Sequence, residues 1–100
     1  HLRSIHLSHN MIKSLDRNFS LFLKANRLRE IYFNNNKFEI IKSFYFSNLT
    51  QLVAIFLAFN QISSINPKSF SNLINLNSLD LSHNCLFRLD KKIFENTHNL

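Results

Sequence analysis

An apolar pattern recurs along this chain with a period of about 24 residues. Each copy has the form apolar-x-x-apolar-x-apolar-x-x-Asn-x-apolar-x-x-apolar. The copies begin at Leu2, Leu28, Leu52 and Leu76, and Leu100 stands where a fifth would begin. The start-to-start spacings are 26, 24, 24 and 24 residues. A fixed period of this length is typical of stacked repeats, so we expect a solenoid rather than a closed globule.

The pattern divides the chain into four repeats within one folded region, residues 1–100. The predicted boundaries are residues 2–27, 28–51, 52–75 and 76–99. The first repeat is two residues longer than the others, and its extra residues lie between Leu15 and Phe22. We expect the chain to be a piece of something longer, because its first residues already belong to the pattern.

The first segment of each repeat alternates apolar and polar residues, which predicts a strand with one buried face. In the second repeat, Ile31 and Phe33 should point inward, while Glu30, Tyr32 and Asn34 point outward. A single repeat has nothing to cover its apolar side. Stacking neighbours at about 4.8 Å, the spacing of paired strands, gives a parallel sheet over a continuous core.

Two further columns of the pattern have a structural interpretation. An Asn follows each predicted strand, where the chain turns, and its amide can bond backbone groups of two neighbouring turns. This predicts an asparagine ladder of Asn10, Asn36, Asn60 and Asn84. A phenylalanine six residues before each next start predicts a stacked column behind the sheet. Its members are Phe22, Phe46, Phe70 and Phe94.

The segments Leu79–Asn84 (LDLSHN) and Ile5–Asn10 (IHLSHN) are close to a family consensus. The chain resembles leucine-rich repeats of the 24-residue class, as in Toll-like receptor ectodomains, small leucine-rich proteoglycans and insect immune repeat proteins. The resemblance covers essentially the whole chain and implies a right-handed, horseshoe-shaped α/β-type solenoid. The parallel sheet would line its concave face, and irregular or short helical segments its convex side. The longer first repeat departs from the family pattern, and cysteine-rich caps are absent.

Function is expected on the outward strand positions, since repeat proteins bind partners on this extended surface. Exposed aromatic residues are common anchors of protein interfaces, and Ala54 and Ala58 should leave the ring of Phe56 uncovered. The candidate partner-binding residues are His6, Tyr32, Phe56, Phe59 and Asp80. The alternative is that these repeats are a structural spacer with no direct ligand contact.

The charge of +6 raises the question of nucleic acid. The basic residues Arg17, Lys42, Lys68, Lys91 and Lys92 should form a ridge at the edge or on the convex side. Surfaces that bind nucleic acid carry basic residues and aromatic rings side by side. In this chain the basic residues and the aromatic residues are expected on different faces. We therefore expect a protein ligand or co-receptor and not nucleic acid.

The composition of the chain argues against several other classes of protein. The chain has no glycine, which excludes phosphate-binding loops, and Cys85 is its one cysteine, which excludes an internal disulfide or a Cys-based zinc site. No cofactor or metal is expected. The longest uncharged apolar run, Leu52–Phe59, is too short for a membrane helix. In an unfolded or uncapped chain this run would favour aggregation.

The fourth repeat contains Asp80, Ser82 and His83, but no glycine-flanked nucleophile turn accompanies them, so we expect no enzyme. Two glycosylation sequons occur, at Asn18 and Asn48, which is the number that chance would give. The resemblance implies an extracellular or cell-surface protein of recognition, in innate immunity or cell adhesion. An intracellular scaffold remains the alternative.

Overall fold

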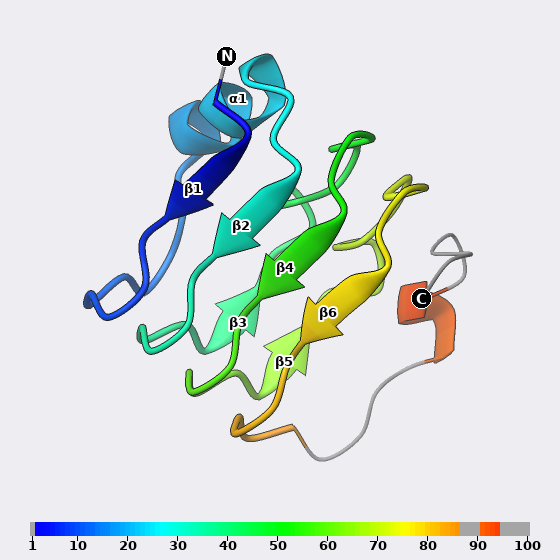
Figure 1. Cartoon of the computed structure of the whole chain (residues 1–100). Helices are drawn as coiled ribbons and strands as arrows, with labels where there is room; N and C mark the ends of the chain where they lie inside the picture. Colours follow the sequence, from blue (N-terminus) through cyan, green and yellow to red (C-terminus); the bar gives the residue numbers. More distant parts are fainter. Residues whose placement is uncertain (1, 87–90, 95–100) are drawn as a thin grey trace.

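The outward face of the molecule is a parallel sheet built from one short strand per repeat. Figure 1 shows the computed structural model, which describes residues 2–86 and 91–94. The strands stand side by side in chain order: β1 (Ser4–His6), β2 (Glu30–Tyr32), β4 (Ala54–Phe56) and β6 (Ser78–Asp80). Every neighbouring pair is parallel. This architecture confirms the repeat solenoid that the sequence predicted.

The register of the sheet follows the repeat period. Ile5 pairs with Ile31, Ile31 with Ile55, and Ile55 with Leu79. The backbone ladder continues past the strands, where the amide of Phe33 donates to the carbonyl of Phe56 at 2.8 Å. Equivalent residues of successive repeats therefore form columns across the sheet. The repeat boundaries themselves stay a prediction, because a continuous stack does not define where each unit begins.

The opposite side of the stack is irregular and carries short elements. Behind the sheet lie α1 (Arg17–Ala25), the two-stranded parallel sheet of β3 (Ile40–Ile41) and β5 (Ser64–Ile65), and the 3₁₀ helix η1 (Lys91–Phe94) (Figure 1). The side chain of Asp16 caps α1 by accepting a hydrogen bond from the amide of Phe19 at 2.8 Å. The two extra residues of the first repeat thus accommodate a helix where the next two repeats have turns.

The core fills the space between the two sides. Ile31, Phe33 and Leu57 are fully buried, as the alternating pattern predicted. In the first repeat the equivalent residues Ile5 and Leu7 are only partly buried, because no preceding repeat covers them in this chain. Burial of apolar surface stabilises a fold by about 25 cal/mol per Å², and it is the main stabilising contribution in such a stack.

Side-chain amides connect the turns that follow the strands. Asn60 accepts a hydrogen bond from the amide of Phe38 at 3.1 Å and donates to the carbonyls of Phe33 at 3.1 Å and Leu57 at 3.0 Å. Asn36 and Asn84 make the corresponding bonds to the repeats before them. Asn10 is exposed and donates only to carbonyls of its own turn. Each bridge thus points to the preceding repeat, which Asn10 lacks here.

Aromatic rings stack along the back of the core. Phe46 and Phe70 have centroids 6.4 Å apart, as do Phe70 and Phe94, with interplanar angles of 11° and 5°. The prediction that Phe22 belongs to this column is wrong. Phe22 lies on α1, is 40% exposed and contacts Phe19 instead. The helix turns its next residue, Leu23, fully into the core, because successive helical side chains point about 100° apart.

Candidate functional site

Aromatic side chains form a continuous row across the outward face of the sheet. The rings of His6 and Tyr32 stack with centroids 4.2 Å apart and planes 9° apart, and those of Tyr32 and Phe56 at 4.7 Å and 14°. Strand neighbours are about 4.8 Å apart, so equivalent rings on adjacent strands fit face to face. The row covers three repeats, with His6 exposed and Tyr32 and Phe56 partly exposed.

Asp80 occupies the next position of this row, paired in register with Phe56. Its Oδ1 accepts hydrogen bonds from the hydroxyl of Ser82 at 2.6 Å and the amide of Ser82 at 3.0 Å. These bonds, helped by the nearby His83, hold the pKa of Asp80 below its usual value. The row therefore passes from stacked rings to an ionised carboxylate at neutral pH.

Tyr32, at the centre of the row, lies beside a second carboxylate. Partial burial raises the pKa of the Tyr32 hydroxyl, and the charge of Glu30 and a hydrogen bond to it raise it further. At the first strand, Ser4 Oγ lies 3.2 Å from His6 Nε2. The surface around the rings is therefore polar and, at Glu30 and Asp80, acidic.

The prediction that Ala54 and Ala58 leave the Phe56 ring uncovered is wrong. Both alanines are buried, at 5% and 4% exposure, and Phe56 itself is only partly exposed. The small side chains lie low between larger neighbours, and Phe56 packs on Tyr32. Asn34 Oδ1 also accepts a hydrogen bond from the amide of Ala58 at 2.8 Å. Phe56 therefore belongs to a supported row and is not an isolated ring.

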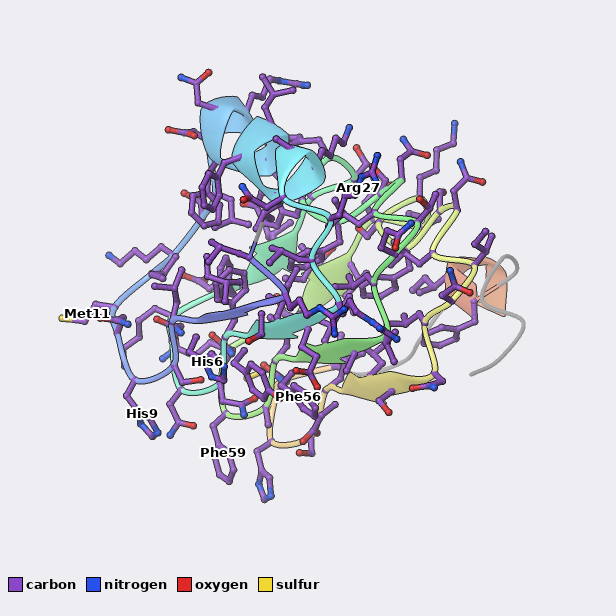
Figure 2. All side chains as sticks on the ribbon, turned by 45° about the horizontal axis from the view of Figure 1, so that its top comes forward. His6, His9, Met11, Arg27, Phe56 and Phe59 are labelled. Atoms are coloured by element: carbon purple, nitrogen blue, oxygen red, sulfur yellow. The ribbon has the colours of Figure 1, made fainter. Side chains whose placement is uncertain are left out.

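A second aromatic pair projects from the turns just beyond the strands. Phe59 is 53% exposed and stacks on His83 with centroids 4.1 Å apart and planes 7° apart. Figure 2 shows Phe59 and His9 extending past the sheet, while His6 and Phe56 lie over it. We call Phe59 and His83 the rim pair.

The rim residues share an unusual backbone conformation. His9, Asn35, Phe59 and His83 all have left-handed backbone, with φ between 56° and 60°. The ladder imposes this geometry, since the amide of Phe59 donates to the carbonyl of Ser82 at 3.0 Å. Asn adopts it readily, but a bulky Phe does so at a cost of about 1–2 kcal/mol. Phe59 is 53% exposed in spite of this cost, which marks it as a candidate for function.

In the described part of the chain, no group of three His, Cys, Asp or Glu side chains could hold a metal ion. Asp80 and Ser82 bond directly to each other on one strand face, as adjacent outward positions do. Cys85 is free and exposed. No helix in the described residues is long and apolar enough to span a membrane.

The two sequon residues lie outside the strands. Asn18 is exposed on α1, and its partner hydroxyl, on Ser20, is buried. Asn48 is exposed with left-handed backbone, φ 67°, and its Oδ1 accepts a hydrogen bond from Asn72 at 2.6 Å. This bond fixes the Asn48 amide and leaves its nitrogen available.

The basic residues lie in two places, of which the sequence predicted only one. Of the predicted ridge, the guanidinium of Arg17 packs over the ring of Phe44 at 4.4 Å, and Arg17 and Lys42 line one hollow of about 440 Å³. The side chains of Lys91 and Lys92, and Leu100, lie outside the described residues. A different basic group, at the amino ends of β1 and β2, was missed. Its signal was that Arg3 and Arg29 each occupy the second position of their repeat.

Comparison with known proteins agrees with this architecture. The family profile described as "Leucine rich repeat" matches residues 26–86 and 50–100. Among curated proteins, none matches the chain. The crystal structure of a TLR13–ssRNA13 complex superposes with a TM-score of 0.86 and 28% identity. The structure of the Toll–Spatzle complex, a hub of Drosophila development and innate immunity, superposes with a TM-score of 0.84 and 26% identity.

The chain is much shorter than either of these structures. The matches cover 98% and 97% of this chain but only 14% of TLR13 and 14% of Toll. The likeness therefore concerns about four repeats within a long array.

Proposed function

The chain belongs to the leucine-rich repeat family, and from that premise we propose that its outward sheet face binds a protein ligand or co-receptor. The anchors would be Phe56 and Phe59, with His6, Tyr32 and Asp80 around them. The observation that carries the proposal is Phe59, which is 53% exposed and held with left-handed backbone beside the stacked row. Large aromatic side chains dominate the energetics of protein interfaces.

Protein is favoured over nucleic acid by the way the rings are arranged. A base needs a free ring face on which to stack. The inner faces of His6, Tyr32 and Phe56 cover one another, so the row offers mostly edges. Glu30 and Asp80 also add negative charge to this face, which phosphates avoid. We therefore propose binding of a protein and no enzymatic activity.

We further propose that the chain is part of an extracellular recognition protein of the receptor type. Support comes from its likeness to Toll, which the solved complex pairs with Spatzle, and to TLR13. Innate immunity and cell adhesion are both compatible with that likeness. The alternatives are a spacer without ligand contacts and an intracellular scaffold.

The binding proposal is tested by placing a photo-crosslinking phenylalanine analogue at Phe56 or Phe59 in the intact protein on the cells that express it. We expect protease-sensitive adducts at both positions. Met11 is the matched control, because it is also apolar and 77% exposed but lies away from the row (Figure 2). Nuclease-sensitive adducts, or equal crosslinking at Met11, would contradict the proposal.

Substitution then measures the contribution of each anchor to the partner that crosslinks. Phe56→Ala and Phe59→Ala should each weaken binding by about tenfold or more, as typical for interface anchors. Met11→Ala should leave it unchanged. A spacer would tolerate all three substitutions, so unchanged affinity in the Phe variants would support the spacer alternative instead.

An extracellular location predicts N-glycosylation, and Asn48 is the better placed of the two sequon residues. Its amide nitrogen is exposed while its oxygen is held by Asn72. We expect Asn48→Gln to remove a glycan mass from the intact protein expressed in animal cells, measured by mass spectrometry. Asn66→Gln, at an exposed asparagine outside any sequon, is the control. An identical mass distribution with and without Asn48 would argue against this site.

A further inference from the structure

Four basic side chains gather at the amino ends of β1 and β2, at the opposite end of the strands from the rim pair. We call them the basic edge: Arg3, Lys24, Arg27 and Arg29. All four are exposed, and Figure 2 shows Arg27 far from Phe59. The backbones of Arg3 and Arg29 are direct neighbours, because the amide of Arg29 donates to the carbonyl of Arg3 at 2.7 Å.

Two shallow hollows lie along the basic edge. One, of about 300 Å³, is lined by Lys24, Arg27 and the polar residues Asn48, Thr50 and Gln51. The other, of about 260 Å³, is lined by Arg3, Arg29, Glu30 and Val53. Leu28 lines the first hollow and Arg29 lines the second, so consecutive residues of the chain border the two. Cations therefore border a surface long enough for more than one anionic group.

Little negative charge opposes these cations. The one carboxylate that lines either hollow is Glu30, which also acts on the Tyr32 hydroxyl of the sheet face. Lys24 and Arg27 lie near the carboxyl end of α1, where positive charge stabilises the helix dipole. Arg3 and Arg29 are not near a helix end, so helix stabilisation does not explain their charge.

We propose that the basic edge binds a sulfated polysaccharide of the heparin type. Arg side chains bind oxyanions through two parallel N–H donors, and Arg3 and Arg29 stand about one strand spacing apart. The hydroxyl of Thr50 and the amide of Gln51 suit the hydroxyls of sugar rings. No aromatic side chain lines either hollow, so nothing there would stack on nucleic-acid bases.

The test measures heparin affinity of the intact protein against salt concentration in an Asn48→Gln background, because a glycan on Asn48 would stand in one hollow. Two double variants probe the two hollows: Arg3→Gln with Arg29→Gln, and Lys24→Gln with Arg27→Gln. Each should weaken binding by about tenfold or more and flatten the salt dependence, as fewer counterions are released. All four side chains are exposed, so the fold should be retained.

The matched control is Lys37→Gln with Lys68→Gln, which removes the same charge from exposed positions elsewhere. It should change heparin affinity by less than about twofold. Desulfated heparin should not bind. An equal loss in the control variant would mean that net charge alone attracts heparin, and would overturn the proposal. Tighter binding of single-stranded RNA than of heparin at the same salt would also overturn it.

Discussion

Asn60 illustrates how a single side chain joins two repeats. It is 6% exposed, and its amide group bonds the backbone of its own turn and of the turn before it. These backbone groups lie where the chain leaves the sheet, so no strand partner is available to them. The polar amide of Asn60 can be buried because each of its donor and acceptor atoms has a hydrogen-bond partner.

We predict that Asn60→Ala lowers the free energy of unfolding by about 1–3 kcal/mol, the usual cost of leaving buried polar groups unpaired. The measurement is chemical denaturation of the chain fused to a capping repeat at its carboxyl end only, so that Asn10 keeps no repeat before it. Asn10→Ala is the control, because Asn10 is exposed and bonds only its own turn. It should cost less than about 0.5 kcal/mol when solvent can replace its bonds. Equal losses in both variants would count against the ladder.

Among the elements, α1 differs most from its counterparts in the other repeats. It is a nine-residue helix with Asp16 as its N-cap, and only Ser20 and Leu23 of its residues are buried. The next two repeats have turns in which Asn48 and Asn72 adopt left-handed backbone. A helix this short is marginal in isolation, so its cap and its packed face should both matter.

Removing the cap tests this view of α1. Asp16→Ala should destabilise the protein by about 1 kcal/mol, because the amide of Phe19 loses its acceptor. Asp16→Asn retains an acceptor oxygen and should be nearly neutral. The readout is the midpoint of thermal unfolding for both variants. A comparable loss in the Asn variant would show that charge, and not the cap hydrogen bond, is responsible.

The described residues form a stack, and its outer repeats differ from those in the middle. Within the described residues, β1 and β6 each pair on one side only. Ile5, Leu7 and Ile12 are partly exposed in the first repeat, while their equivalents Ile31, Phe33 and Phe38 are fully buried. Nearest-neighbour contacts between repeats therefore supply much of the stability.

We expect a polar capping repeat fused before the first repeat to raise the melting temperature of this chain. A gain of about 1 kcal/mol corresponds to roughly 4–8 °C for a domain of this size. Circular dichroism measures the transition, and light scattering measures aggregation through uncovered edges. The control is the same cap with charged residues at its packing positions. If that control stabilises equally, burial of Ile5 and Leu7 is not the cause.

The repeat period alone determined the order of the strands, the inward face, the column of Asn and, after the first repeat, the column of Phe. Translation by one repeat brings equivalent residues to the same place on neighbouring strands, so a linear pattern is sufficient. His6, Tyr32 and Phe56 could be put in one column for this reason. Asn36, Asn60 and Asn84 could be assigned to the turns in the same way.

Only the tertiary structure decided which side chains are buried and which neighbours bury them. The phase of α1 turned Phe22 outward and Leu23 inward, because two extra residues break the period there. Ala54 and Ala58 became buried under larger neighbours, and ring faces closed on one another, since packing depends on side-chain size as well as direction. Lys24 and Arg27 joined Arg3 and Arg29 through the path of the chain after α1, which the strand pattern does not describe.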